Sequence, residues 1–386
     1  MSSKAFELLN RLFQWNETRV HELNYLFWEC TTRCNLHCIH CGSDCTAAGG
    51  EPDMPADDFL RAFDTIPPDV RAKHFTVVMT GGEPLLRPDL PEIGRQLRRR
   101  GVGWSIVSNG YLYDEAMHQR LMSGGMGAVT ISLDGIGDDH DWMRGREGCY
   151  QRTIKAIAIA AKEKRINFDV VTCVNKRNLP CLQEIHDLLA SLGVPQWRLF
   201  TIIPIGRACD HEELHLSDGQ LVELMEFIKV KRESATQTIK HSSIQTIKHS
   251  STQTIKQSSI QTIMNVTFSC EGFLGPYEMQ VRQNPFFCHA GINIASVLID
   301  GTISACPNID RKVFGQGNIY KDNLWEVWNS GFRQFRDRSW TRRGMCADCK
   351  VANRCHGGGM HNWHGDCKES ISCHYMKLIN GKQAGR

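Results

Sequence analysis

Cys34-Asn-Leu-His-Cys38-Ile-His-Cys41 is the most informative stretch of this sequence. Its C-x3-C-x2-C spacing offers three thiolates from a single loop. A [4Fe-4S] cluster has four irons that each prefer one thiolate, so three cysteines leave one iron open to another ligand. Structural zinc needs four ligands, and no second cysteine pair lies close by in sequence. The spacing favours a cluster with an open iron, while His37 and His40 keep a zinc site as an alternative.

Polar groups follow three predicted strands downstream of this loop. Adjacent glycines let the backbone approach a ligand closely, and a glutamate carboxylate suits an ammonium group. A two-residue period places alternate side chains on one side of a strand. The groups are Gly81, Gly82 and Glu83 after Phe75–Met79, Ser108 and Asn109 after Trp104–Val107, and Ser132 and Asp134 at the end of Ala128–Leu133.

Strands and helices alternate through the first half of the chain, which predicts an α/β fold. Such βα units form a parallel sheet, and right-handed crossovers curve it into a partial (β/α)6 barrel whose active site lies at the carboxyl ends of the strands. The predicted strands are Asn24–Glu29, Phe75–Met79, Trp104–Val107, Ala128–Leu133, Phe168–Val174 and Gln196–Ile203. The predicted helices are Leu90–Arg100, Asp114–Met122, Gln151–Lys164, Leu182–Leu192 and Gln220–Val230.

In this order, the motifs resemble those of the radical S-adenosylmethionine (radical SAM) enzymes. The resemblance implies that the open iron at Cys34, Cys38 and Cys41 chelates S-adenosylmethionine, which is cleaved to a 5′-deoxyadenosyl radical. It also implies a role for each matching position. Gly81, Gly82 and Glu83 would bind the amino group, Ser132 and Arg144 the carboxylate, Asp134 the ribose, His40, Ile203 and Gly206 would lie on the adenine side, and Ser108 and Asn109 match the polar turn after the third family strand.

A cysteine-rich region closes the chain. Its cysteines are Cys270, Cys288, Cys306, Cys346, Cys349, Cys355, Cys367 and Cys373. The segments Cys288…Gly301-x4-Cys306 and Cys346-x2-Cys349-x5-Cys355 resemble the SPASM domain, which implies one or two auxiliary [4Fe-4S] clusters. Eight thiolates are the number that two fully ligated clusters need.

One position departs from the SPASM pattern, which expects a further cysteine where Gly359 stands. Cys367 can replace it through a longer loop; otherwise one cluster is missing or has an open site. A zinc knuckle of Cys346, Cys349, Cys355 and either Cys367 or Cys373 is the alternative. The cysteines outside these motifs are expected to be small buried apolar side chains: Cys30, Cys45, Cys149, Cys173, Cys181 and Cys209.

Length and composition set further limits. The 386 residues exceed the size of a typical single core, and the net charge of +3 with scattered Lys and Arg gives no indication of nucleic-acid binding. Seventeen cysteines favour metal binding in a reducing compartment over a disulfide framework. No apolar run is long enough for a membrane span, and the start lacks the apolar core of a signal peptide. We therefore expect a cytoplasmic protein.

These features predict four segments: an N-terminal helix at 1–23, the barrel at 24–232, an insert at 233–264 and the SPASM domain at 265–386. In the helix, Phe6, Leu9, Leu12 and Phe13 have helical spacing, and the helix is expected to pack on the barrel. The insert repeats Gln-Thr-Ile-Lys with a period of eight from Gln237, and we expect it to be flexible or weakly β-forming. A substrate-contacting flap is the functional alternative.

The SPASM resemblance predicts a radical SAM oxidoreductase that oxidises or crosslinks a peptide or protein, with a flavodoxin or ferredoxin as low-potential electron donor. Within that group, systems with a small lipoprotein and a short precursor peptide are one hypothesis. Sulfatase maturation is an alternative, although Pro307 stands where those enzymes carry an acidic residue. Two hypotheses come from different classes: an oxidoreductase of small-molecule or cofactor biosynthesis, and an electron-transfer or scaffold protein without catalytic activity. No leader-peptide-binding module is expected before Cys30.

Overall fold

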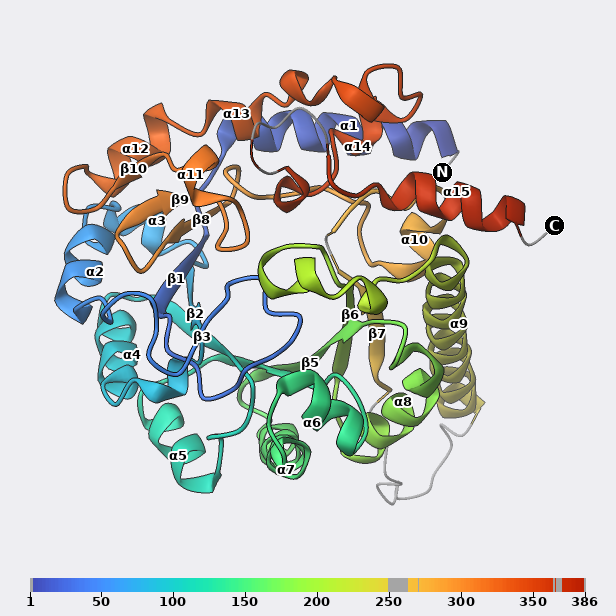
Figure 1. The fold of residues 1–386 in the computed structure, drawn as a ribbon, viewed down its shortest axis with the longest axis horizontal. Helices are drawn as coiled ribbons and strands as arrows, with labels where there is room; N and C mark the ends of the chain where they lie inside the picture. Colours follow the sequence, from blue (N-terminus) through green and yellow to red (C-terminus); the bar gives the residue numbers. More distant parts are fainter. Residues whose placement is uncertain (1–2, 249–262, 270, 364, 366–369, 385–386) are drawn as a thin grey trace.

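The computed structural model describes residues 3–248, 263–269, 271–363, 365 and 370–384. Strands form one open sheet in the order β10-β9-β8-β1-β2-β3-β4-β5-β6-β7. From β8 through β1 to β7 every neighbouring pair is parallel. Seen in Figure 1, the sheet curves around the centre of the molecule. The predicted partial barrel is confirmed.

The six predicted strands are all present, and each bound lies within two residues of the expected one. The strands are β1 Tyr25–Thr31, β2 Thr76–Gly81, β3 Gly103–Ser108, β4 Ala128–Ser132, β5 Asn167–Val174, β6 Gln196–Thr201, β7 Asn265–Phe268, β8 Ile294–Val297, β9 Thr302–Ser304 and β10 Gly317–Asn318. Prediction missed β7 and β8 as further parallel members of the sheet, because each is only four residues long.

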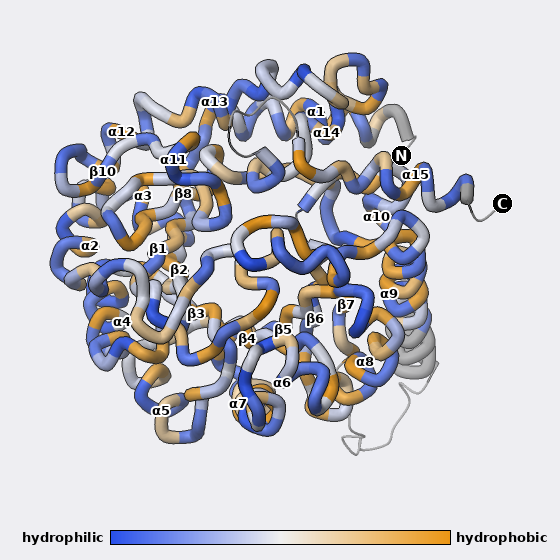
Figure 2. Tube along the Cα trace, in the orientation of Figure 1, coloured by the Kyte–Doolittle hydropathy of each residue, from blue (hydrophilic) through white to orange (hydrophobic). Residues whose placement is uncertain are grey.

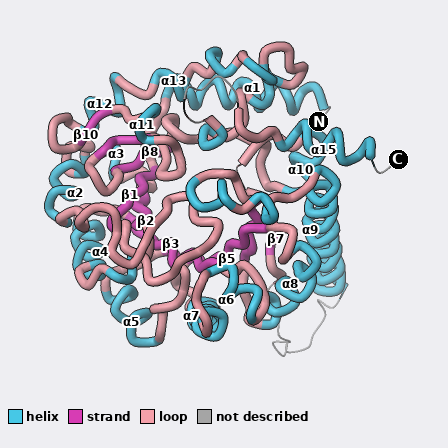
Figure 3. The backbone as a smooth tube through the Cα atoms, in the orientation of Figure 1, coloured by secondary structure: helices cyan, strands magenta, loops and turns pink. Residues whose placement is uncertain are grey.

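Helices surround the strands (Figure 3). The five predicted helices correspond to α4, α5, α7, α8 and the first part of α9. The full set is α1 Ser3–Val20, α2 Ala56–Phe63, α3 Pro68–Arg71, α4 Leu90–Arg99, α5 Glu115–Ser123, α6 Asp138–Arg144, α7 Cys149–Lys162, α8 Leu182–Ser191, α9 Asp218–Lys248, α10 Glu278–Val281, α11 Arg311–Phe314, α12 Leu324–Ser330, α13 Arg333–Arg336, α14 Ala352–Cys355 and α15 His374–Ala384.

The two faces of the sheet differ because side chains alternate along each strand. Trp28 of β1 stacks on Phe59 of α2, and Trp197 of β6 packs edge-on against Phe227 of α9, so these tryptophans face the helices. Apolar residues accordingly recur along the strands and the surrounding helices (Figure 2). Neighbours of the tryptophans in the chain, such as Phe27 and Arg198, lie on the inner face of the curved sheet.

The cysteine-rich region is continuous with the barrel rather than separate from it. Strand β8 pairs in parallel with β1, and β9 returns antiparallel to β8, which gives the predicted strand-turn-strand before Cys306. The buried carboxylate of Glu29 in β1 connects the barrel to the cysteine-rich region. It accepts a hydrogen bond from the Ile299 amide at 3.0 Å and forms an ion pair with Arg311 at 2.8 Å. No break in the sheet marks the proposed boundary at residue 265, because β7 also pairs with β6.

Helix α1 lies beside α13 and α14 of the cysteine-rich region (Figure 1). The buried Gln14 side chain donates to the Phe286 carbonyl at 3.2 Å and contacts His356 at 3.3 Å. Leu9, Leu12 and Phe13 remain more than half exposed. The amphipathic helix is therefore present, and it contacts the cysteine-rich region through these polar groups and through Phe13, whose ring centre lies 6.4 Å from that of Phe287.

Helix α9 continues into the octapeptide repeat, so the expectation of a flexible or β-forming insert is wrong for residues 237–248. Extending an existing helix adds one hydrogen bond per residue without a new nucleation cost, which outweighs the weak helix propensity of Thr and Ile. Ahead of the repeat, α9 contributes the buried residues Leu221, Leu224, Met225 and Ile228 to the core. Arg232, ahead of the repeat, donates to Asn265 and Val266 of the sheet. Residues 249–262 lie outside the described part.

Deleting residues 245–260, which are two repeats, should change the free energy of unfolding by no more than about 1 kcal/mol. The reason is that each twofold change in loop length changes the free-energy cost of closing the loop by only about 0.6 kcal/mol. Urea unfolding followed by circular dichroism measures this. As a matched control, Leu224→Ala on the buried face should cost about 2–5 kcal/mol. A comparable loss in the deletion variant would show that the repeat packs against the barrel; loss of substrate turnover alone would support the flap.

Among the described helices, none combines the length and apolar character that a bilayer span requires.

Candidate active site

The three cysteines Cys34, Cys38 and Cys41 lie on one loop after β1, and the first two are buried. Arg207, in the turn after β6, holds this loop. Its Nε donates to the Cys38 carbonyl at 2.8 Å, its Nη1 pairs with Asp44 at 2.6 Å, and its amide donates to the Cys41 carbonyl at 3.1 Å. Prediction missed Arg207, although it directly follows Gly206.

Glycines bring the surrounding turns up against the cysteine loop. A Cβ on Gly81 would lie 2.0 Å from the Thr31 carbonyl oxygen, and one on Gly82 would lie 2.2 Å from that of Arg33. Gly206, at φ +58°, would place a Cβ 2.5 Å from the Cys41 oxygen. Close approach was predicted for Gly81 and Gly82; the structure shows close approach to the backbone at Thr31 and Arg33, and contact with a ligand stays a prediction. The amides of Gly82 and Glu83 donate to these same two carbonyls.

Glu83 is fully buried, and its carboxylate is shared among three protein donors. Oε1 accepts from the Leu85 amide at 3.0 Å and from Ser108 Oγ at 2.9 Å, while Oε2 accepts from the Asn109 amide at 2.8 Å. Burial raises the pKa of Glu83 to about 7, against the opposing effect of these donors. Glu83 thus joins the ends of β2 and β3. The structure shows this role for its carboxylate, and contact with an ammonium group stays a prediction.

Glu83→Gln should destabilise the protein by about 1–3 kcal/mol, because the amide NH2 cannot accept from all the donors that the two carboxylate oxygens serve, and an unmet buried donor costs about that much. Urea unfolding of the anaerobically purified protein measures the change. Glu92→Gln on the exposed surface of α4 is the control and should be neutral. Equal stability of the two variants would contradict the assigned network.

Asn109 links this network to the cysteine loop. Its Nδ2 donates to Asn35 Oδ1 at 2.8 Å and lies 3.9 Å from the Cys34 sulfur. Ser108 and Asn109 are therefore brought to the predicted site, where their contacts are Glu83 and the loop. Ser132 at the end of β4 and Ile203 after β6 are half-buried.

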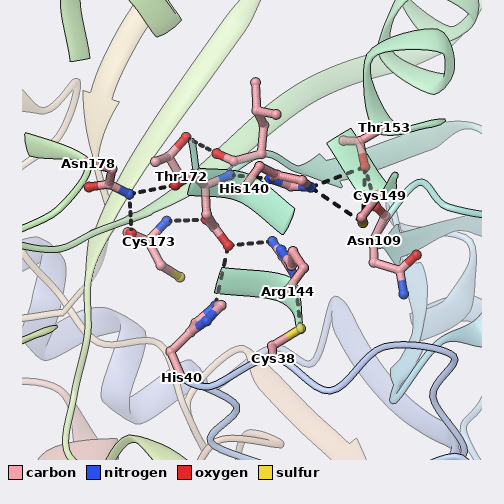
Figure 4. A network of polar contacts seen from close by, with 12 residues as sticks. Cys38, His40, Asn109, His140, Arg144, Cys149, Thr153, Thr172, Cys173 and Asn178 are labelled. Atoms are coloured by element: carbon pink, nitrogen blue, oxygen red, sulfur yellow. Dashed lines mark hydrogen bonds and ion pairs between the residues drawn. The ribbon is translucent and has the colours of Figure 1, made fainter. Parts of the chain in front are cut away.

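A second network surrounds Asp134, just beyond β4. Figure 4 shows its partners His40, Arg144 and Cys173. Arg144 Nη2 lies 2.7 Å from Asp134 Oδ2, and His40 Nε2 lies 3.4 Å from the same oxygen. Asp134 Oδ1 accepts from the Cys173 amide at 2.8 Å, and Arg144 Nη1 donates to the Cys38 sulfur at 3.7 Å. The predicted residues His40, Asp134 and Arg144 thus meet at one cysteine of the loop.

Electrostatics in this network follow from burial and pairing. Burial alone would raise the pKa of Asp134, but Arg144 and the two nearby histidines lower it below its usual value. Burial lowers the pKa of His40 to about 4. His40 Nδ1 and Arg144 Nε are buried with no hydrogen-bond partner among the described residues. Two unsatisfied polar groups beside three cysteines fit a polar ligand at this place.

His140 of α6 contacts the backbone of Asp134, and prediction missed it as a residue of the site. The Asp134 amide donates to His140 Nδ1 at 3.0 Å, so the ring proton lies on Nε2, which faces Thr153 Oγ1 at 3.3 Å. Burial lowers the pKa of His140 to about 3. A neutral imidazole therefore fixes the turn that carries Asp134.

The thiols of the loop differ in acidity. A hydrogen bond from Cys45 lowers the pKa of Cys41, while burial raises the pKa of Cys34 to about 12 and also raises that of Cys38. Thiolates bind metal, so binding at this loop must release protons from Cys34 and Cys38. The three sulfurs and the unsatisfied groups around them fit an iron-sulfur cluster with an open iron. Cys45 is buried, as expected, and is in addition the hydrogen-bond partner of Cys41.

Four of the C-terminal cysteines lie together. Besides burial, the neighbouring thiols Cys373 and Cys349 raise the pKa of Cys346, and Cys373 and Cys346 contribute to raising that of Cys355 to about 12. This arrangement brings the Cys346-x2-Cys349-x5-Cys355 motif to Cys373 at the start of α15. Four thiols in one place suit either a fully ligated cluster or zinc.

The other predicted ligands are Cys270, Cys288, Cys306 and Cys367. Cys270 and Cys367 lie outside the described residues, so their assignment stays a prediction. The Gly365 amide, near Cys367 in sequence, donates to Asp310 at 3.4 Å, a few residues after Cys306. Gly359, where the SPASM pattern expects cysteine, has no space for one, since a Cβ would lie 2.6 Å from the Glu271 carbonyl oxygen.

The remaining cysteines only partly meet the expectation of burial. Cys30 and Cys149 are buried, Cys181 is half-buried, and Cys209 is exposed. Cys173 is half-buried and lies with His40 and Asp134 in a group whose ligand atoms are within 4.8 Å of one another. It faces the site because it lies on the inner face of β5.

Comparison with known proteins places these features in two families. The model of the radical SAM superfamily matches residues 28–189, and that of the SPASM iron-sulfur cluster-binding domain matches residues 288–350. The solved structure of anSMEcpe with bound AdoMet is similar in fold, with a TM-score of 0.67 and 17% identity over 94% of this chain and 97% of that chain.

Two curated relatives match over most of their length. The AdoMet-dependent heme synthase of Methanosarcina barkeri is 26% identical over 86% of this chain and 89% of its own. The mycofactocin maturase of Mycobacterium ulcerans is 27% identical over 87% of this chain and 82% of its own.

Proposed function

Because this chain is a radical SAM enzyme with a C-terminal SPASM domain, we propose that it oxidises a small molecule of cofactor biosynthesis, of the tetrapyrrole class. The observation that carries the proposal is the alignment with the AdoMet-dependent heme synthase, which extends over 86% of this chain. Such coverage includes both the barrel and the cysteine-rich region. The enzyme uses a [4Fe-4S] cluster with an open iron, S-adenosylmethionine and one or two auxiliary clusters.

When bound, these groups supply the electron and the 5′-deoxyadenosyl radical that removes a hydrogen atom from the substrate. Cys34, Cys38 and Cys41 would hold the cluster, and Arg207 keeps their loop in place. His40 Nδ1 and Arg144 Nε, which lack partners among the described residues, would contact S-adenosylmethionine. Gly81, Gly82, Glu83, Ser108 and Asn109 would set the position of the loop against the strand ends. Ser132, Asp134 and Ile203 remain proposed contacts.

The inner face of the sheet supports a substrate with a large apolar body. Phe27, Val107, Val171 and Phe200 are only half-buried there, whereas their neighbours on the outer face are covered by helices. Arg198 lies on the same face, 34% exposed, with its guanidinium 5.7 Å from the centre of the Phe200 ring. Its Nε pairs with the Asp169 carboxylate and its Nη2 donates to Thr130 Oγ1, and these contacts orient the guanidinium. Apolar side chains beside one guanidinium suit a tetrapyrrole with carboxylate arms.

The test is anaerobic incubation of the reconstituted enzyme with dithionite, S-adenosylmethionine and porphyrins or their iron complexes. We expect 5′-deoxyadenosine to rise several-fold with the right tetrapyrrole and the substrate to change mass in step. Arg198→Ala should weaken turnover, with Arg177→Ala on the exposed surface as control. Absence of any stimulation across the porphyrin series, together with a mass change on a peptide encoded near the gene, would overturn the proposal.

A peptide substrate, expected from the sequence, is the second candidate. It is favoured by the alignment with the mycofactocin maturase over 87% of this chain. A sulfatase-maturase activity has weaker support, because Pro307 occupies the position of the expected acid. A lipoprotein-associated peptide system and a flavodoxin or ferredoxin donor remain predictions.

A further inference from the structure

A cavity of 520 Å³ lies between α1 and the cysteine-rich region, away from the cysteine loop. Arg11 and Trp15 of α1 form one wall, and the segment from Phe335 to Arg342 together with His356 forms the other. Small-molecule sites in proteins usually measure about 300–1,000 Å³. The cavity has the size of a ligand site and is built from elements outside the inner face of the sheet.

Positive charge gathers around this cavity. After burial itself, the guanidinium groups of Arg338, Arg342 and Arg11 are what lower the pKa of His356, so all three lie near its ring. Arg336 also lines the cavity, and Asp337 is the acidic residue of its wall. The Asp337 carboxylate accepts from the Ser339 amide at 2.9 Å.

These arginines have no acidic partner among the described residues. Arg336 donates to the carbonyls of Gly291, Trp328 and Gly331. Arg338 donates likewise to carbonyls, including that of Cys288 at 2.8 Å. The Arg342 side chain donates to the Asn353 side chain, and the Arg11 side chain has no hydrogen bond or ion pair with a described residue. Free guanidinium donors therefore face the cavity from both walls.

Aromatic side chains line both walls of the cavity beside the arginines. Trp15 is 57% exposed, while Phe335 is fully buried and Phe287 lines the cavity beside them. A partly exposed tryptophan gains stability when a flat apolar group covers it. The arginines would complement an anionic group, and the aromatic rings would complement a flat apolar group.

We propose that this cavity binds an organic anion with a flat apolar body and a carboxylate, phosphate or sulfonate group. The anion is bound by Arg11 and Arg342, and the apolar body contacts Trp15 and Phe287. The inference does not rest on the proposed function, since none of these residues lies at the cysteine loop or on the inner face of the sheet.

The test uses the cluster-reconstituted protein and two matched probes, 8-anilinonaphthalene-1-sulfonate and its uncharged sulfonamide. Isothermal titration calorimetry should show one site that prefers the sulfonate. Arg11→Gln/Arg342→Gln should weaken sulfonate binding by about tenfold or more, as expected for lost charge-assisted hydrogen bonds, and leave sulfonamide binding unchanged. Trp15→Ala should weaken both probes.

Arg333→Gln is the control, because Arg333 is an exposed arginine of α13 outside the cavity wall. It should bind both probes as the wild type does. Wild-type affinity for the sulfonate should also fall with rising salt, which tests the charge contribution without any substitution. Equal affinity for the two probes, salt-independent binding, or unchanged sulfonate binding in the double variant would overturn the proposal.

Discussion

Replacing Cys34, Cys38 and Cys41 together by Ala should abolish cleavage of S-adenosylmethionine. The three thiolates assigned to the cluster would then be absent, and the protein should lose about one [4Fe-4S] equivalent of iron and sulfide. The measurements are 5′-deoxyadenosine by mass spectrometry and iron and sulfide by chemical assay. The auxiliary cysteines are unchanged, so the remaining iron reports the SPASM sites separately.

Cys209→Ala is the matched control, since Cys209 is an exposed cysteine of the same barrel. It should keep full cleavage and full iron content. Unchanged cleavage in the triple variant would rule out the assigned cluster site. A loss of zinc rather than iron would support a zinc site instead.

Arg144→Ala should destabilise the protein by about 3–5 kcal/mol, because removal of one partner leaves the other charge buried without compensation. Only 9% of the Arg144 side chain and 1% of the Asp134 side chain are exposed. Urea unfolding under anaerobic conditions measures the loss. His40 Nε2 lies 3.4 Å from the same Asp134 carboxylate, so a protonated His40 would compensate part of the Asp134 charge. The loss of stability in the variant should therefore be smaller at acidic pH, where His40 becomes protonated.

Arg177→Ala provides a comparison at nearly the same separation. Arg177 and Asp139 lie 2.6 Å apart, but their side chains are 45% and 32% exposed. An exposed pair contributes only up to about 1 kcal/mol because water screens both charges. Similar losses in the two variants would contradict the view that burial decides the strength of the Asp134–Arg144 pair.

The local sequence led to an incomplete view of several residues. Glu83 was recognised as part of the site, yet its carboxylate serves Leu85, Ser108 and Asn109. The repeat was recognised as too polar for a core, but its described segment to Lys248 is helical. The contacts of Glu83 and the helical state of the repeat both depend on neighbours that the local pattern does not contain.

Two features of this protein were determined by the sequence alone: the alternation of strands and helices, and the identity of the cysteine loop. Both are local, since side-chain period and cysteine spacing are properties of short segments. Only the tertiary structure decided that Arg207 holds Cys38, that Arg144 pairs with Asp134, and that Cys373 joins Cys346, Cys349 and Cys355. Arg207 and Cys38 are 169 residues apart, and such a contact forms only when the sheet brings the carboxyl ends of β1 and β6 to the same edge.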